Sequence, residues 1–246
     1  MDYFLELFLG GLTRGSIYAL IALGYTMVYG IIELINFAHG EIYMIGAFTG
    51  LIVISVLTLL GWNTVAIIVI AAIVAMIYSA AYGYTIEKIA YKPIRGSQRL
   101  SALISAIGMS LFLQNYVLLA QTSNFLPYPN LIPEFGFVKP IEDIVRSTEI
   151  VIYLAAALVM VALTFLIKFT RMGKAMRAVA QDRDMAMLVG VDVNRVISFT
   201  FIIGSSIAAL GGGLVASHIG QVNFYVGFIV GIKAFGGLVQ KPYRCI

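Results

Sequence analysis

The stretch IYMIGAFTGLIVISVLTLL, residues 42–60, contains no charged side chain. The hydrocarbon core of a bilayer is about 30 Å thick and needs roughly 20 apolar residues to cross it as an α-helix. Lipid offers no hydrogen-bond partner to backbone N–H and C=O groups, and a helix satisfies these groups internally. The stretch therefore predicts a transmembrane helix.

The rest of the chain has the same character. Hydrophobic residues make up 61% of the 246 residues and charged residues only 11%, against about 25% in soluble domains. The mean hydropathy is +0.96, so charge cannot cover a water-exposed surface. We expect an all-α, polytopic transmembrane helix bundle with six to seven spans, near residues 15–35, 42–60, 65–83, 101–121, 150–169 and 196–217, with a weaker seventh at 224–239.

The two ends of the chain carry less regular signals. Residues 2–12, DYFLELFLGGL, are too short for a span and acidic at one end, which predicts an N-terminal interfacial helix on the membrane surface. The acidic start also lacks the cationic region of a cleaved signal peptide. Cys245 is the single cysteine, so no internal disulfide and no cysteine-based metal cluster are expected.

The distribution of basic residues predicts the orientation. Two segments, 84–100 and 168–195, are rich in Lys and Arg, whereas the segment between them, 122–149, is mainly acidic. The positive-inside rule places both basic segments in the cytoplasm and the N-terminus outside. The net charge of +4 is then explained by loops that face anionic membrane lipid, and no nucleic-acid partner is expected.

Small residues and prolines add detail to this bundle. Pairs such as Gly46 with Gly50 and Gly204 with Ala208 are four residues apart, which favours close helix packing in lipid. The run Gly211–Gly213 predicts a break or kink in the sixth span. The segment FLPYPNLIP at 125–133 predicts a stiff, extended loop, which is either a plain rigid loop or a docking surface for an outside partner.

A helix is expected in the second basic segment. Residues from Lys174 to Val189 include no Pro or Gly, and Gly190 follows where a C-cap is favoured. Asp192 or Asn194 can then cap the next span. Two interpretations stay open for this helix: a connector held at the lipid headgroups by its arginines, or a helix presented to a cytoplasmic partner.

The segment INFAHGE, residues 35–41, places polar groups between two apolar runs without any Lys or Arg. Asn36, His39 and Glu41 suit a re-entrant or broken-helix segment buried against protein. Ionisable groups at membrane depth are functional candidates, so we hypothesise that these three residues line a translocation path. The alternative is a tight turn in which His39 caps a helix end.

Other chemistry finds little support. His39 and Glu41 lack a third ligand nearby, so no metal site is expected. Asp182 and Asp184 point apart on a helix and do not form a catalytic pair, and no catalytic set of residues is visible, so no enzyme is expected. The chain has no phosphate-binding Gly-Lys-Ser/Thr loop and binds no cofactor itself. Three functional classes then compete: a passive subunit driven by a separate ATPase, an ion-coupled secondary transporter with Glu33 or Glu41 at a span end as its candidate ion-binding carboxylate, and an intramembrane enzyme.

Several long motifs resemble one transporter family. The stretches GSIYALIALGYTMVYGIIELINFAHGEIYMIGA (15–47), AYGYTIEKIAYKPIRGSQRLSALISAIGMSLFLQN (81–115), AVAQDRDMAMLVGVD (178–192) and FTFIIGSSIAALGGGLVA (199–216) are similar to the LivH-type permease subunit of branched-chain amino-acid ABC importers. The resemblance runs from about residue 5 to 235. A urea or short-amide permease shares the general pattern and is the alternative within the same class.

The resemblance implies a single permease domain over residues 1–246 in a bacterial or archaeal inner membrane. It implies ABC ATPase subunits that hydrolyse ATP, a second homologous permease, and a periplasmic or lipid-anchored substrate-binding protein as partners. The coupling loop would be 168–195, and its ATPase-docking residues would be Ala180, Gln181, Asp182, Ala186 and Gly190.

The chain departs from the family at two places. Gln181 stands where relatives often have Glu, which removes one charge from the docking element. The ending GGLVQKPYRCI is polar where relatives continue into apolar helix, so a truncated or frameshifted C-terminus is expected. Lys233 lies within the weak last span and would reach the interface or face the bundle.

Overall fold

The computed structural model describes residues 2–32, 36–95, 97, 99–131 and 146–239. In chain order its elements are α1 (Asp2–Ile32), α2 (Ala38–Leu59), α3 (Thr64–Ile86), the π-helical segment η1 (Glu87–Tyr91), the 3-10 turn η2 (Lys92–Ile94), α4 (Arg99–Ala120), β1 (Leu126–Pro127), α5 (Ser147–Phe169), α6 (Arg171–Gln181), α7 (Arg183–Leu188), α8 (Val193–Ile219), β2 (Gln221–Val222) and α9 (Val226–Val239).

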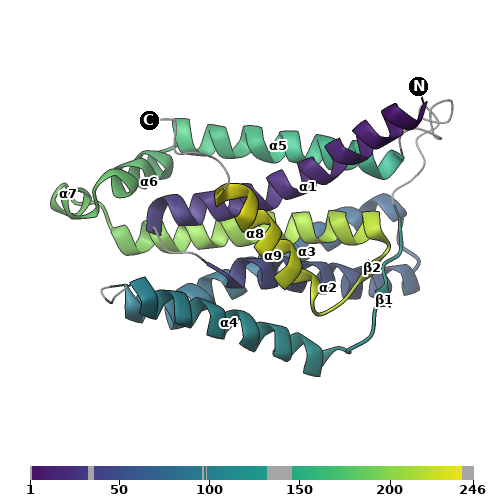
Figure 1. The fold of residues 1–246 in the computed structure, drawn as a ribbon, viewed down its shortest axis with the longest axis horizontal. Coiled ribbons are helices and arrows are strands. Elements are labelled where there is room, and N and C mark those ends of the chain that lie inside the picture. The colour runs from purple at the N-terminus through teal and green to yellow at the C-terminus, as the bar shows by residue number, and fades with distance from the viewer. Residues whose placement is uncertain (1, 33–35, 96, 98, 132–145, 240–246) are drawn as a thin grey trace.

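The described residues contain six helices long and apolar enough to cross a membrane, which confirms the all-α polytopic bundle. They cover Leu7–Ile32, Ala38–Leu59, Thr64–Ile94, Leu100–Ala120, Ser147–Phe169 and Val193–Ile219, and their axes run along the length of the molecule (Figure 1). The weak seventh stretch forms α9, a helix of 14 residues that is too short to span. It crosses the bundle obliquely against α1 and α2, and its Lys233 is exposed.

The N-terminus differs from its prediction. Residues 2–12 do not form a separate interfacial helix, because α1 continues without a break from Asp2 to Ile32. No proline interrupts this region. Gly10, Gly11 and Gly15 each lower helix stability, but the helix tolerates this cost because its backbone hydrogen bonds continue on both sides.

The centre of the bundle is the contact of α2 with α3 and α8. A Cβ on Gly46 would lie 2.5 Å from the Cα of Ala209, and one on Gly212 would collide with the carbonyl oxygen of Tyr43. The backbones of α2 and α8 therefore touch directly, as small residues permit in a membrane. The predicted break at Gly211–Gly213 is wrong: α8 stays helical through it, because α2 packs against this glycine surface.

The two ends of the bundle differ in charge. One end, which we call the basic end, carries η1, η2, α6 and α7, and the N-terminus lies at the opposite end (Figure 1). At that opposite end β1 pairs antiparallel with β2. This pairing lays Tyr128 on the bundle, with its backbone N–H donating to Gly220 O at 2.9 Å.

Tyr128 fixes the proline-rich segment to the bundle. Its side chain is 6% exposed, and its hydroxyl faces Gly50 and Gly213. Tyr128 is one of the residues that line an apolar cavity of about 90 Å³ between α2, α3 and α8. Burial raises the pKa of Tyr128 to about 12, so the hydroxyl stays neutral there. The extended conformation predicted for this segment holds as far as Leu131, whereas Pro133 lies outside the described residues.

Candidate functional site

Helix α6 lies against the basic end with one apolar face. Gly173, Met176 and Val179 are buried at a spacing of three residues, and the basic residues between them are exposed. This amphipathic pattern packs α6 onto α5, α1 and α8. Thr170 caps its start by accepting from Gly173 N at 2.9 Å.

The predicted single helix from Lys174 to Val189 is wrong, because the chain turns at Asp182. Asp182 is extended, with φ −157° and ψ 115°, and its carboxylate accepts from Asp184 N at 2.9 Å and Met185 N at 3.0 Å. A side chain that caps a new helix competes with continuation of the old one. The segment is therefore two helices, α6 and α7, joined at a corner.

The predicted caps at the far side of α7 are confirmed. Gly190 has φ +85° and donates to Met187 O at 3.0 Å, which ends the helix in the left-handed region where glycine is favoured. Asp192, rather than Asn194, caps α8 by accepting from Arg195 N at 3.1 Å.

α7 and Val189, the residue that follows it, present exposed apolar side chains. Leu188 is 80% exposed and Val189 77%, and Met185 and Met187 are also exposed. This surface was not predicted from the sequence, although the run MAMLV at 185–189 was a visible signal. Of the five predicted docking residues, four are exposed and one, Ala186, lies on the buried face of α7: Ala180, Gln181, Asp182, Ala186 and Gly190.

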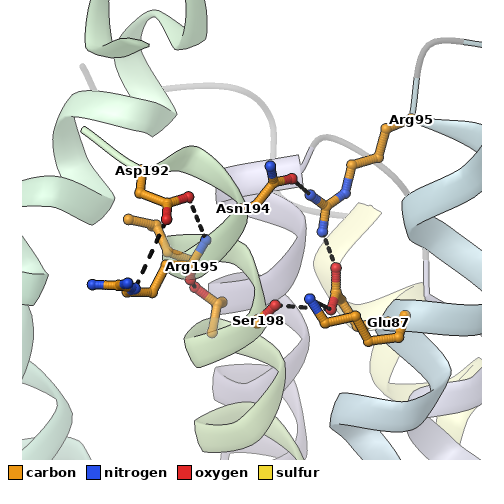
Figure 2. A network of polar contacts seen from close by, with 9 residues as sticks. Glu87, Arg95, Asp192, Asn194, Arg195 and Ser198 are labelled. Carbon is orange, nitrogen blue, oxygen red and sulfur yellow. Dashed lines mark hydrogen bonds and ion pairs between the residues drawn. The ribbon is translucent and has the colours of Figure 1, made fainter. Parts of the chain in front are cut away.

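A buried ion pair supports the basic end beside this hairpin (Figure 2). Glu87 in η1 has a fully buried side chain and pairs with the guanidinium of Arg95. Ser198 of α8 donates to the second carboxylate oxygen at 2.8 Å, and Arg95 also donates to Asn194 Oδ1 at 2.7 Å. The network thus joins η1 and the segment after η2 to the first turns of α8.

Arg183 connects α7 to the same region. It donates to the carbonyl of Ile31, in the last turn of α1, at 2.8 Å. Burial lowers the pKa of Arg95, the charge of Glu87 opposes this shift, and the positive charge of Arg183 adds to it. α7 is therefore hydrogen-bonded to α1, and the positive charge of its Arg183 repels that of Arg95.

The three polar residues of INFAHGE are all buried. Asn36 is 2% exposed, His39 1% and Glu41 0%. Asn36 accepts from the Tyr91 hydroxyl at 2.8 Å and Glu41 accepts from Ser110 Oγ at 3.0 Å. One polar atom of each has no partner among the described residues: Asn36 Nδ2, His39 Nε2 and Glu41 Oε2.

Their depth follows from their neighbours. His39 lies against Gly24 and Gly204, the latter near the middle of α8, and Ser110 is near the middle of α4. Helix α2 thus begins inside the bundle rather than at its basic end, and Phe37 at its N-cap gives no side-chain cap. Glu41 lies in the first turn of α2, at a span end as the ion-coupled hypothesis stated, but this end is buried inside the bundle. Glu33 lies outside the described residues.

Over the described residues, no group of three His, Cys, Asp or Glu side chains is placed to hold a metal ion. His39 instead packs edge-on against the Tyr25 ring, with 4.6 Å between the ring centroids. Glu41 accepts a hydrogen bond from Ser110.

Comparison with known proteins agrees with the fold. The family described as "Branched-chain amino acid transport system / permease component" matches residues 7–239. The chain is 47% identical to the high-affinity branched-chain amino acid transport system permease protein LivH of Escherichia coli (strain K12), over 98% of this chain and 81% of that protein. It is 46% identical, with the same coverage, to the permease protein BraD of Pseudomonas aeruginosa. No solved structure matches the chain.

Proposed function

The chain belongs to the family of permease components of branched-chain amino acid transport systems, and we therefore propose that it forms the path by which branched-chain amino acids cross the inner membrane. Energy comes from ATP hydrolysed by separate ATPase subunits. The exposed apolar surface of α7 is the observation that carries this proposal.

That surface suits a protein partner. Contiguous exposed apolar residues on a water-facing part of a protein favour an interaction site, and α7 lies beyond the ends of the spans among basic residues. The Asp182 cap fixes the corner, and Arg183 ties α7 to the last turn of α1. A partner that pushes α7 therefore moves α1, and both α7 and α1 contact α8 directly.

The family relationship suggests the partners. Two ABC ATPase subunits would dock on α7 of this chain and of a second, homologous permease, with Ala180, Gln181, Asp182 and Gly190 at the contact and Ala186 beneath it. The basic end would then face the cytoplasm and its anionic lipid, and the N-terminus would be outside. A periplasmic or lipid-anchored binding protein would deliver substrate to the opposite end.

We propose the buried INFAHGE residues as part of the path. The chain enters the bundle from the basic end through the segment that carries Asn36, His39 and Glu41. Each of these side chains has an unpartnered polar atom that can form a hydrogen bond with a passing solute. Rocking of the spans about this level would open the path to one side at a time. The 47% identity to LivH favours branched-chain amino acids over urea or short amides as the solute.

Gly190 offers a test of the coupling role. Replacing Gly190 with valine puts a β-branched residue at φ +85°, a strain of roughly 1–2 kcal/mol or more, with no other atom within 4 Å of the added Cβ. We expect normal membrane insertion and continued ATP hydrolysis, but loss of leucine uptake by the reconstituted importer.

The matched control is Gly61→Val. Gly61 has φ +70° and equally open surroundings, but it lies at the opposite end of the bundle between α2 and α3. Uptake by this variant is expected to stay near that of the unmodified chain. Normal uptake in Gly190→Val would contradict the coupling role of α7.

A further inference from the structure

The starts of α2 and α9 meet at three glycines in the middle of the bundle. A Cβ on Gly40 would collide with the carbonyl of Gly227, and one on Gly227 would lie 2.5 Å from the Gly40 oxygen. A Cβ on Gly231, one turn along α9, would lie 3.4 Å from the Cα of Gly40. The two helices therefore touch backbone to backbone.

Two unpartnered polar atoms face this crossing. Oε2 of Glu41 lies 2.7 Å from the Cβ position of Gly227, and the Tyr25 hydroxyl lies 3.3 Å from that of Gly231. Glu41 is 0% exposed and Tyr25 3%, and neither atom has a hydrogen-bond partner in the described part of the chain. Buried polar atoms are nearly always paired in proteins, so these two atoms point to a ligand.

Glu41 also lacks a cation. Its other oxygen accepts from Ser110, a neutral group, and none of the ion pairs among the described residues involves Glu41. An ionised carboxylate away from water is costly unless a cation approaches it. Next to it, the first turns of α2 and α9 are the positive ends of two helix dipoles, which favour an anion.

These features match a zwitterion, and we propose that Glu41 binds the ammonium group of the transported amino acid at the α2–α9 crossing. The Tyr25 hydroxyl and the helix starts bind the carboxylate. In this structure the crossing is closed, and movement of α9 away from Gly40 opens it. The inference rests on the proposed transport function and assigns one chemical role within it.

The variant Glu41→Gln keeps the shape of the side chain and removes its charge. In the complete importer in proteoliposomes, with ATP and radiolabelled leucine, we expect the maximal uptake rate to fall about 10- to 100-fold, the value of a charged hydrogen bond. The leucine concentration for half-maximal uptake should not change, because the binding protein captures the substrate first. Complex assembly and ATP hydrolysis should continue, and Glu41→Asp, which keeps the charge, should recover part of the uptake.

Glu149→Gln is the matched control, since it makes the same chemical change in the first turn of α5, away from the crossing; its uptake should be unchanged. Full uptake by Glu41→Gln, a failure of that variant to assemble, or equal loss in the Gln and Asp variants would overturn the inference. Failure of the proposed function is a separate result: the unmodified importer would then show no ATP-driven leucine uptake.

Discussion

Replacing Arg95 with methionine is expected to lower the unfolding temperature of the purified protein by roughly 10 °C, from a loss of about 3–5 kcal/mol. The reason is that the fully buried Glu87 carboxylate would lose its guanidinium partner. Lys88, whose Nζ lies 3.9 Å from Glu87 and whose side chain is a third exposed, would replace only part of that interaction. Thermal unfolding in detergent, followed by size-exclusion chromatography, measures the change.

Two further variants make this prediction specific. Arg195→Met removes an ion pair to Asp192 that is drawn beside the first (Figure 2) but is exposed, 78% and 56% for the two side chains, with a separation of 3.8 Å; its effect should stay below about 1 kcal/mol. The double variant Glu87→Gln with Arg95→Met removes both charges and should recover most of the stability. Equal losses for Arg95→Met and Arg195→Met would show that the buried network carries no special weight.

Replacing Gly212 with alanine is expected to separate α2 from α8 and to destabilise the bundle by about 1–3 kcal/mol. The added methyl group would meet the backbone carbonyl of Tyr43, which no rotamer change can move. Helix propensity alone would favour alanine by about 1 kcal/mol. A measured loss of stability would therefore mean that the packing clash outweighs helix propensity. The unfolding temperature and leucine uptake should both fall.

Gly108→Ala provides the comparison. Gly108 is exposed within α4 and has no atom within 4 Å of a Cβ position, so its replacement should be neutral or slightly stabilising. Equal behaviour of the Gly212 and Gly108 variants would contradict direct backbone contact between α2 and α8.

The sequence predicted those parts of the fold that depend on composition along the chain. The six spans follow from apolar length, and the spacing of small residues predicted close helix packing but not which helices touch. In the structure Gly46 faces Ala209 of α8, whereas Gly204 faces mainly α1. The continuous α8 through Gly211–Gly213 was not predicted, because propensity counts the cost of glycine but not the helix that packs onto it. The short α9 was likewise ambiguous from hydropathy alone.

The site was predictable in its residue types but not in its geometry. INFAHGE was identified as polar without basic residues, yet the depth of Glu41 depends on Ser110, far along the chain. The corner between α6 and α7 forms because the Asp182 side chain caps the start of α7. The sequence around Asp182 would otherwise favour one continuous helix. The Glu87–Arg95–Asn194 network joins residues from separate segments, and no local spacing reveals it.

Leucine uptake by proteoliposomes that contain the full importer distinguishes ATP-driven transport from ion-coupled transport. The proposed mechanism predicts uptake that requires both ATP and the ATPase subunits and that persists when a protonophore collapses the proton gradient. Uptake that continues without ATP and stops with the protonophore would contradict it, and would assign Glu41 to proton coupling instead.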